Sequence, residues 1–190
     1  MTLGQILALA LRQLDEDAED VSEYESVFRV YANAAYRIAV VEFLKPREER
    51  HLFTDAQGVA PLGCTGIVRV VSLRKKGEGG EETVGFVLSE DGRRVCTTHS
   101  DAELTAMCEV EYPEMEAVSD KPRLPESVHG ALADYICYRH LSDGGEEKQK
   151  QAQHYLRTFY QAMQRLRPDG FGSVTRFKNL YAVTDVRYGQ

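Results

Sequence analysis

The spacing of the apolar residues changes twice along this chain, and this change constrains the fold more than any other feature. Up to residue 44 the apolar residues recur every three or four positions, as they do along one face of a helix. Between residues 50 and 120 they form short runs rich in β-branched residues, separated by turn signals, which is typical of strands. After residue 122 the helical spacing returns. A β segment between two helical parts predicts an α+β fold.

Residues 2–45 are expected to form two helices separated by the acidic run 15–20. Thr2 with Gln5, and Ser22 with Glu25, each fit a capping box, in which the two side chains satisfy backbone N–H groups at a helix start. The second helix is expected to stop at Pro46, because proline lacks the N–H that would continue it. Its expected buried side consists of Tyr24, Val27, Phe28, Tyr31, Ala35, Ile38 and Ala39.

The middle of the chain is expected to form about five short strands. They are residues 51–54, 66–73, 83–88, 93–98 and 104–112. Turn signals rich in Gly and Asp separate them. This pattern predicts a small antiparallel sheet, sandwich or barrel.

The last helical part is expected to be a hairpin of two helices. Pro125 suits the first turn of a helix, because its missing N–H costs nothing there. Gly144 and Gly145 predict the turn between the two helices. Neither helix pair buries its apolar face alone, so we expect both pairs to pack into one helical bundle.

These patterns divide the chain into four parts. We expect an N-terminal helix pair over residues 1–48 and an inserted antiparallel β subdomain over 49–121. A C-terminal helical hairpin follows over 122–167, and a C-terminal extended arm over 168–190. The first and third parts together form the predicted helical body.

Charge and hydropathy exclude several classes of protein. The net charge is −7, which argues against a broad basic surface that holds DNA or an anionic membrane. No apolar stretch approaches the roughly 18 residues of a membrane-spanning helix, so no membrane partner is expected. The N-terminus lacks the basic region and cleavage site of a signal peptide, so we expect a mature helix there.

No reactive site is expected, and we predict that the protein is not an enzyme. The sequence has no P-loop, no dinucleotide-binding glycine motif and no serine elbow. Cys96 and His99 lie close in sequence, but no second pair completes a metal site, so no metal or cofactor is expected. Cys137 and His140 are three residues apart on a predicted helix, but apolar neighbours predict a buried, inert thiol.

The C-terminal arm combines aromatic and basic residues behind Gly170 and Gly172. So much aromatic surface is atypical of a purely disordered tail, so we expect the arm to dock on a partner. Its candidate partner-binding residues are Phe171, Arg176, Phe177, Lys178, Tyr181, Arg187 and Tyr188.

A second candidate contact is the basic run of Arg74, Lys75 and Lys76, with Arg69 nearby. One interpretation is contact with an acidic protein or with phosphates, and the other is an ordinary solvated strand end. Four cations would give nucleic-acid binding that is weak and sensitive to salt.

Three segments resemble the adaptor (head–tail connector, head-completion) proteins of tailed bacteriophages and prophages. The first is the short helix, the acidic break and the second helix with its Ala-Ala-Tyr-Arg-Ile run at residues 34–38. The second is Leu-Pro-Glu at residues 124–126, followed by His129, Leu132 and Tyr135. The third is the Gly-Gly-Glu-Glu turn that leads to Ala-Gln-His-Tyr-Leu at residues 152–156. The resemblance covers roughly residues 1–45 and 120–167.

The resemblance implies a non-enzymatic ring subunit of the virion neck, made in the cytoplasm of a host bacterium. Such rings usually hold twelve copies, bind the portal protein and connect the capsid to a tail or stopper protein. Carried over, the arm 168–190 would grip the portal, while DNA passes through the lumen without specific binding. An acidic subunit suits a lumen along which DNA must slide.

Two other classes of function stay open on the sequence. One is a nucleic-acid-binding factor associated with DNA packaging, which salt-dependent DNA binding would indicate. The other is a small enzyme or ligand-binding domain, which a deep pocket holding Cys, His and carboxylate side chains would indicate.

Overall fold

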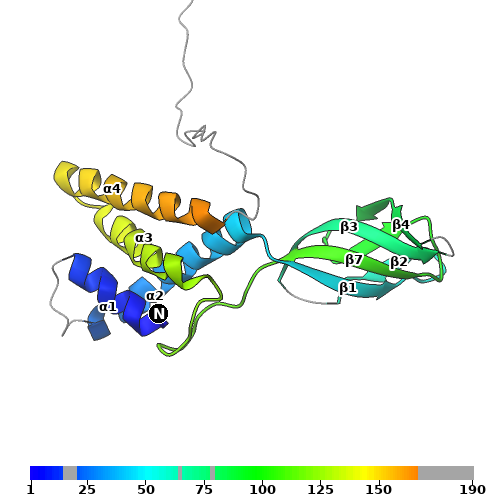
Figure 1. Ribbon diagram of the computed structural model, residues 1–190, viewed down its shortest axis with the longest axis horizontal. Helices are drawn as coiled ribbons and strands as arrows, with labels where there is room; N and C mark the ends of the chain where they lie inside the picture. The colour runs from blue at the N-terminus through cyan, green and yellow to red at the C-terminus, as the bar shows by residue number, and fades with distance from the viewer. Residues whose placement is uncertain (15–20, 64–65, 78–79, 167–190) are drawn as a thin grey trace, which may run out of the picture.

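The computed structural model describes residues 1–14, 21–63, 66–77 and 80–166. These residues form two bodies, a helical body and a β body, joined by a narrow connection (Figure 1). The helical body contains residues from both ends of the described chain, and the β body contains the middle. This α+β arrangement confirms the predicted fold class.

Four α-helices make up most of the helical body. They are α1 (Leu3–Gln13), α2 (Val21–Ile38), α3 (His129–Leu141) and α4 (Glu146–Met163), with the short helices η2 (Ala39–Leu44), η3 (Glu126–Val128) and η4 (Gln164–Leu166). The predicted capping box of α1 is confirmed, because Thr2 Oγ1 accepts from Gln5 N at 3.3 Å and Gln5 Oε1 accepts from Thr2 N at 2.9 Å. Helix α2 begins at Val21, one residue before the predicted cap Ser22.

Helix α3 is the centre of this body. It packs against α1, α2 and α4, and nine of its thirteen residues are buried. Leu132 and Ile136 are fully buried in a core that also contains Phe28 of α2 and Phe159 of α4. Each such side chain contributes about 1.5–3 kcal/mol when it leaves water. The two ends of the described chain therefore share one hydrophobic core.

The end of α2 sets the direction in which the chain leaves the helical body. The helix widens into the π-helical turn η2, in which Lys45 N donates to Val40 O at 2.8 Å. Lys45 has φ of 48°, in the left-handed region, and Pro46 follows it. The helix thus ends where the proline predicts, and the first strand begins at the next residue.

Among the described residues, seven strands form the β body. They are β1 (Arg47–Phe53), β2 (Val59–Pro61), β3 (Ile67–Gly77), β4 (Gly80–Val84), β5 (Phe86–Leu88), β6 (Arg94–Thr97) and β7 (Glu103–Val110). One antiparallel sheet has the strand order β1-β7-β3-β4 and the other has the order β2-β6-β5. Leu52, Leu73, Val95 and Leu104 belong to the hydrophobic core of this body.

Two strand predictions are wrong in detail. The expected strand 83–88 is two strands in different sheets, because the chain breaks at Gly85 between β4 and β5. Strand β2 was not expected, because three residues ending in Pro61 are too short to show an alternating pattern.

One prediction about α2 is also wrong. Val27 was expected on the buried side of the helix, but its side chain is 45% exposed. The buried residues of α2 are Phe28, Ala32, Ala35 and Tyr36, and Ala39 of η2 is also buried. Phe28, Ala35 and Ala39 were predicted on this side. Val27 therefore lies on a different face of the helix.

An arginine–carboxylate cluster lies near the connection between the two bodies. The side chain of Glu109, in β7, is 6% exposed. It accepts hydrogen bonds from Arg69 Nε at 2.7 Å and from Arg69 Nη2 at 2.9 Å, and its Oε1 lies 3.6 Å from Arg47 Nη2. The hydrogen bonds from Arg69 lower the pKa of Glu109. The cluster cross-links three neighbouring strands of the larger sheet.

Within the described part of the chain, no helix combines the length and the apolarity needed to cross a lipid bilayer.

The two bodies have separate cores, so a cavity in one core is expected to act mainly on that body. We expect Leu104→Ala to destabilise the β body by about 2–5 kcal/mol, because Leu104 is 1% exposed. Hydrogen exchange followed by mass spectrometry should show faster exchange in β3 and β7 and unchanged exchange in α3. Leu132→Ala is the matched control and should show the opposite pattern. Equal loss of protection in both bodies would contradict the separation.

Candidate functional site

Helix α2 and its extension η2 carry a second apolar stripe beside the core-facing one, and of its members Ile38 also packs against the core. Its members are Val27, Val30, Ala34, Ile38 and Val41, three or four residues apart. Val30 is 63% exposed and Val27 is 45% exposed. Two apolar stripes on one helix indicate that each has a partner. The inner stripe packs against the core, but no described element covers Val27 and Val30 of the outer stripe.

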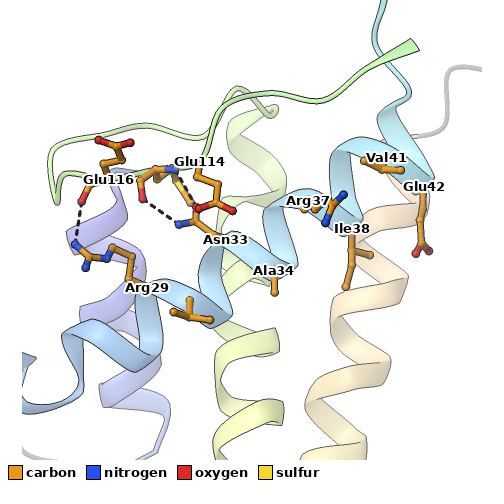
Figure 2. Close-up of a pocket in the computed structure, with 11 residues that line it drawn as sticks. Arg29, Asn33, Ala34, Arg37, Ile38, Val41, Glu42, Glu114 and Glu116 are labelled. Carbon is orange, nitrogen blue, oxygen red and sulfur yellow. Dashed lines mark hydrogen bonds between the residues drawn. The ribbon is translucent and has the colours of Figure 1, made fainter. Parts of the chain in front are cut away.

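A groove runs along this outer stripe (Figure 2). Val30, Ala34, Ile38 and Val41 line one side, and residues 114–116, which return from the β body, line the other. We call this hollow the α2 groove. It has a volume of about 910 Å³ and is open to solvent.

The side chain of Asn33 fastens the returning segment to α2. Its Nδ2 donates to Met115 O at 3.0 Å, and its Oδ1 accepts from Met115 N at 2.9 Å. Arg29 Nη1 also donates to Glu116 O at 3.2 Å, as Figure 2 shows. These three bonds from α2 hold the far wall of the groove at a defined distance from the helix.

The same segment is tied to α1. Asp120 Oδ2 accepts from the backbone N–H groups of Glu116 and Ala117, both at 2.8 Å. In the first turn of α1, Leu3 N donates to Asp120 O at 2.7 Å and Gly4 N donates to Val118 O at 2.8 Å. The wall of the α2 groove is therefore anchored at both of its sides.

Three carboxylates form the charged rim of the α2 groove. Glu42, Glu114 and Glu116 are exposed, and none of them makes an ion pair with any described residue. Of the two arginines that line the groove, Arg37 is paired with Glu111 at 3.1 Å and Arg29 faces a backbone carbonyl. The groove thus combines an apolar stripe with unpaired negative charge, which suits a protein surface that is apolar and basic.

A smaller hollow of about 410 Å³ extends the groove toward the β body. It shares Asn33, Arg37 and Glu114 with the α2 groove and reaches Gly66 and Tyr112 at the connection between the bodies. The concave surface therefore runs from the middle of α2 to the base of the β body.

Of the sequence-predicted partner residues, the structure describes only Arg74, Lys75 and Lys76, and these three do not line the groove. All seven candidates of the arm 168–190 lie outside the described residues. In the second candidate contact, Arg74 Nη1 donates to Glu81 Oε2 at 2.8 Å. Lys75 stands opposite Glu82 and Lys76 stands opposite Glu81 in the β3–β4 pair. Strand β4 thus places carboxylates beside this basic run and offsets much of its charge.

The cysteine and histidine candidates are not brought together into a site. Burial raises the pKa of Cys137 to about 12, and its Sγ donates to Gln13 Oε1 at 3.2 Å. His140 instead packs edge-on against the rings of Tyr24 and Phe28. Among the residues that the structure describes, no three His, Cys, Asp or Glu side chains are grouped to hold a metal.

The motif that carries the phage resemblance is part of the core. Leu124, His129, Leu132 and Tyr135 are all buried. His129 Nε2 donates to Leu124 O at 2.8 Å, while its Nδ1 accepts from the Met1 ammonium at 2.8 Å. In this structure the motif holds the chain ahead of α3 against the helix, so its spacing has a packing explanation.

Sequence reasoning missed the α2 groove, although part of its signal was present. The outer stripe has helical spacing in the sequence, but Val27 and Ile38 were assigned to the buried side, and Val30, Ala34 and Val41 were not recognised as a second face. The far wall lies about 80 residues further along the chain, so only the tertiary fold brings it to α2.

No family model matches this chain, and no curated protein matches it significantly.

Removal of the Asn33 side-chain amide is expected to loosen the wall of the groove. We expect Asn33→Ala to lower the free energy of unfolding by about 1–3 kcal/mol, because the N–H and C=O of Met115 lose their partner in a partly buried place. Urea denaturation measures this change. Asn33→Asp is the comparison variant, because it retains the acceptor but sets a carboxylate oxygen against Met115 O, and it should also lose stability. A neutral Asn33→Ala would show that the segment is held without this side chain.

The buried carboxyl of Asp134 predicts a pH dependence of stability. Burial raises its pKa, although Gln13 Nε2 donates to its Oδ1 at 3.1 Å and lowers it in part. The folded state therefore binds a proton more tightly than the unfolded state. Stability due to this group should fall as pH rises from the ordinary carboxyl pKa through the raised one.

Asp134→Asn is expected to remove this fall and to keep the contact with Gln13. Urea titrations between acidic and neutral pH should show wild type losing stability relative to the variant as pH rises. Parallel curves for the two proteins would contradict the assignment.

Proposed function

We propose that this protein is a structural subunit of the head–tail connector ring of a tailed bacteriophage or prophage. In this proposal it docks under the portal and joins the capsid to the tail around the DNA channel. The observation that carries the proposal is the acid-rimmed α2 groove, in which Val30 of the outer stripe stays 63% exposed. Such a surface suits contact with another protein.

The chemistry of the α2 groove supports a contact function. Its apolar members lie along the middle, while Glu42, Glu114 and Glu116 lie around them. Protein interfaces have this arrangement, because apolar atoms gain most from burial at the centre and charges stay hydrated at the edge. The groove is also built on a helix that is fixed by the central core, so binding orders little of the protein.

The division into two bodies also supports the proposal. The helical body is compact around α3, and the β body extends from it on two chain connections (Figure 1). Helical bodies placed side by side would form the ring, and the β bodies would project from it. The two proposed roles are assembly of the ring and contact with a tail or stopper protein. They thus belong to separate bodies, each with its own hydrophobic core.

The charge of the chain is compatible with a channel for DNA. A net charge of −7 per subunit limits the counterion release that makes DNA adhere to basic proteins. DNA would therefore pass through the lumen without specific binding.

The portal contact is assigned to residues 168–190. The assignment rests on their aromatic and basic composition and on the resemblance to connector proteins. Aromatic and arginine side chains are the usual energetic centres of protein interfaces. Phe171, Arg176, Phe177 and Tyr181 are the first candidates within the segment.

Capture by a portal protein tests the proposal. The chain is co-expressed with the portal protein encoded in the same genome, and the complex is weighed by native mass spectrometry. We expect a complex that contains a closed ring of this chain, with twelve copies by resemblance to the family. Deletion of residues 168–190 should abolish capture, while circular dichroism should show an intact helical body. Capture that survives this deletion would refute the role of the arm, and no complex with the full chain would refute the function.

A further inference from the structure

Helix α4 carries a basic stripe on its outer face. From Lys148 to Leu166 the chain has no Asp or Glu, and it has four cations, Lys148, Lys150, Arg157 and Arg165. The exposed residues Lys150, His154, Arg157, Gln161 and Arg165 follow one another at helical spacing. We call these five residues the α4 stripe.

The two arginines of the α4 stripe have no carboxylate of their own. Lys150 pairs with Glu146 at 2.9 Å, but Arg157 and Arg165 make no ion pair with any described residue. An arginine side chain lays its apolar stem on a surface and keeps its charged end in water. Such side chains can cover valines and reach carboxylates at the same time.

The α4 stripe approaches the α2 groove of its own copy only at its end. Helix α3 packs against both α2 and α4, while η4, which carries Arg165, contacts η2, which carries Val41 and Glu42. The part of the groove around Val30 and Ala34 lies further back along α2, away from this contact. A stripe that runs along this part therefore comes from a second copy.

We propose that the α2 groove of one copy binds the α4 stripe of a second copy. The inference rests on the proposed function, because it names the neighbour that the groove meets in a ring. Glu42, Glu114 and Glu116 then face Arg157 and Arg165, and the arginine stems cover Val30 and Ala34. The contact joins two different surfaces of the chain, which is the kind of interface that generates closed rings.

The α2 groove can hold part of the α4 stripe. Val30 and Val41 are eleven residues apart on α2 and η2, and the part of the α4 stripe from His154 to Arg165 spans the same number of residues. At the rise of a helix each span is about 16 Å. This part of the stripe can therefore lie along the groove, while Lys150 extends beyond it.

Charge argues for this occupant over nucleic acid. Nucleic acid would be repelled by the three rim carboxylates of the groove and could use only the few cations of α4. So few phosphate contacts give weak binding. The segment 167–190 of this chain is also apolar and basic, so it is the competing occupant of the groove. Charge reversal on α4 and deletion of residues 168–190 distinguish the two occupants.

Charge reversal in the full-length chain tests the contact. We expect Arg157→Glu with Arg165→Glu, or Glu114→Lys with Glu116→Lys, to weaken self-association about tenfold in sedimentation equilibrium, because two ion pairs are lost. All four substitutions in one chain should restore it, because the charges pair again in reversed order. Arg93→Glu with Arg94→Glu, on the β body, is the matched control and should have no effect.

Disulfide trapping tests the geometry. Val30→Cys with Gln161→Cys should give a ladder of covalent oligomers on oxidation, while each single variant should stay monomeric. The oxidation is done on the free protein up to about 1 mM and on the portal-bound protein. No ladder in either sample would overturn the proposal. Covalent dimers from Val30→Cys alone would also overturn it, because the groove would then meet another groove.

Two further outcomes would overturn the proposal. One is self-association that is unchanged by the charge reversals but lost on deletion of residues 168–190, which would make the C-terminal segment the occupant. The other is salt-sensitive binding of duplex DNA that Arg157→Glu with Arg165→Glu abolishes, without any effect on self-association. Binding to the portal protein distinguishes this proposal from the proposed function. If the portal protein does not bind the chain but the covalent oligomers form, only the proposed function is refuted. If the portal protein binds the chain but no covalent oligomers form, only the contact between the α2 groove and the α4 stripe is refuted.

Discussion

The packing of three helices around α3 is the constraint on which the rest of the structure depends. Helix α3 is buried along most of its length and contacts α1, α2 and α4. The chain leaves this body after η2 and returns before η3, so the β body is held at both ends by one core. Without α3, α2 would have no fixed inner face, and the outer stripe would have no fixed direction.

Helix α2 is the element in which packing and proposed function meet. Its inner stripe stabilises the core, and its outer stripe leaves Val27 45% and Val30 63% exposed. Asn33 lies between the two and pairs with the backbone of Met115, so the wall of the groove depends on a residue that belongs to neither stripe. A single helix thus couples the stability of the body to the shape of its proposed contact surface.

Much of the fold could be predicted, and much of the candidate site could not. The Thr2 cap and the stop at Pro46 were predictable because they depend on residues within one turn of each other. The break at Gly85 was not, because whether a strand continues or changes sheets depends on its distant partners. Val27 was misplaced for a related reason: an apolar residue beside the buried stripe fits either face until the neighbouring helices are known.

The sequence by itself determined which parts of the chain are helical and which are extended, and that the helical parts enclose a β segment, because hydrophobic periodicity and capping are local. Only the tertiary structure decided that residues 114–116 stand beside α2, that the rim carboxylates have no ion-pair partner among the described residues, and that Glu81 and Glu82 offset the basic run of β3. These facts depend on pairs of residues far apart in the chain. Their distance and charge balance exist only after the helices have packed around α3 and the sheets have formed.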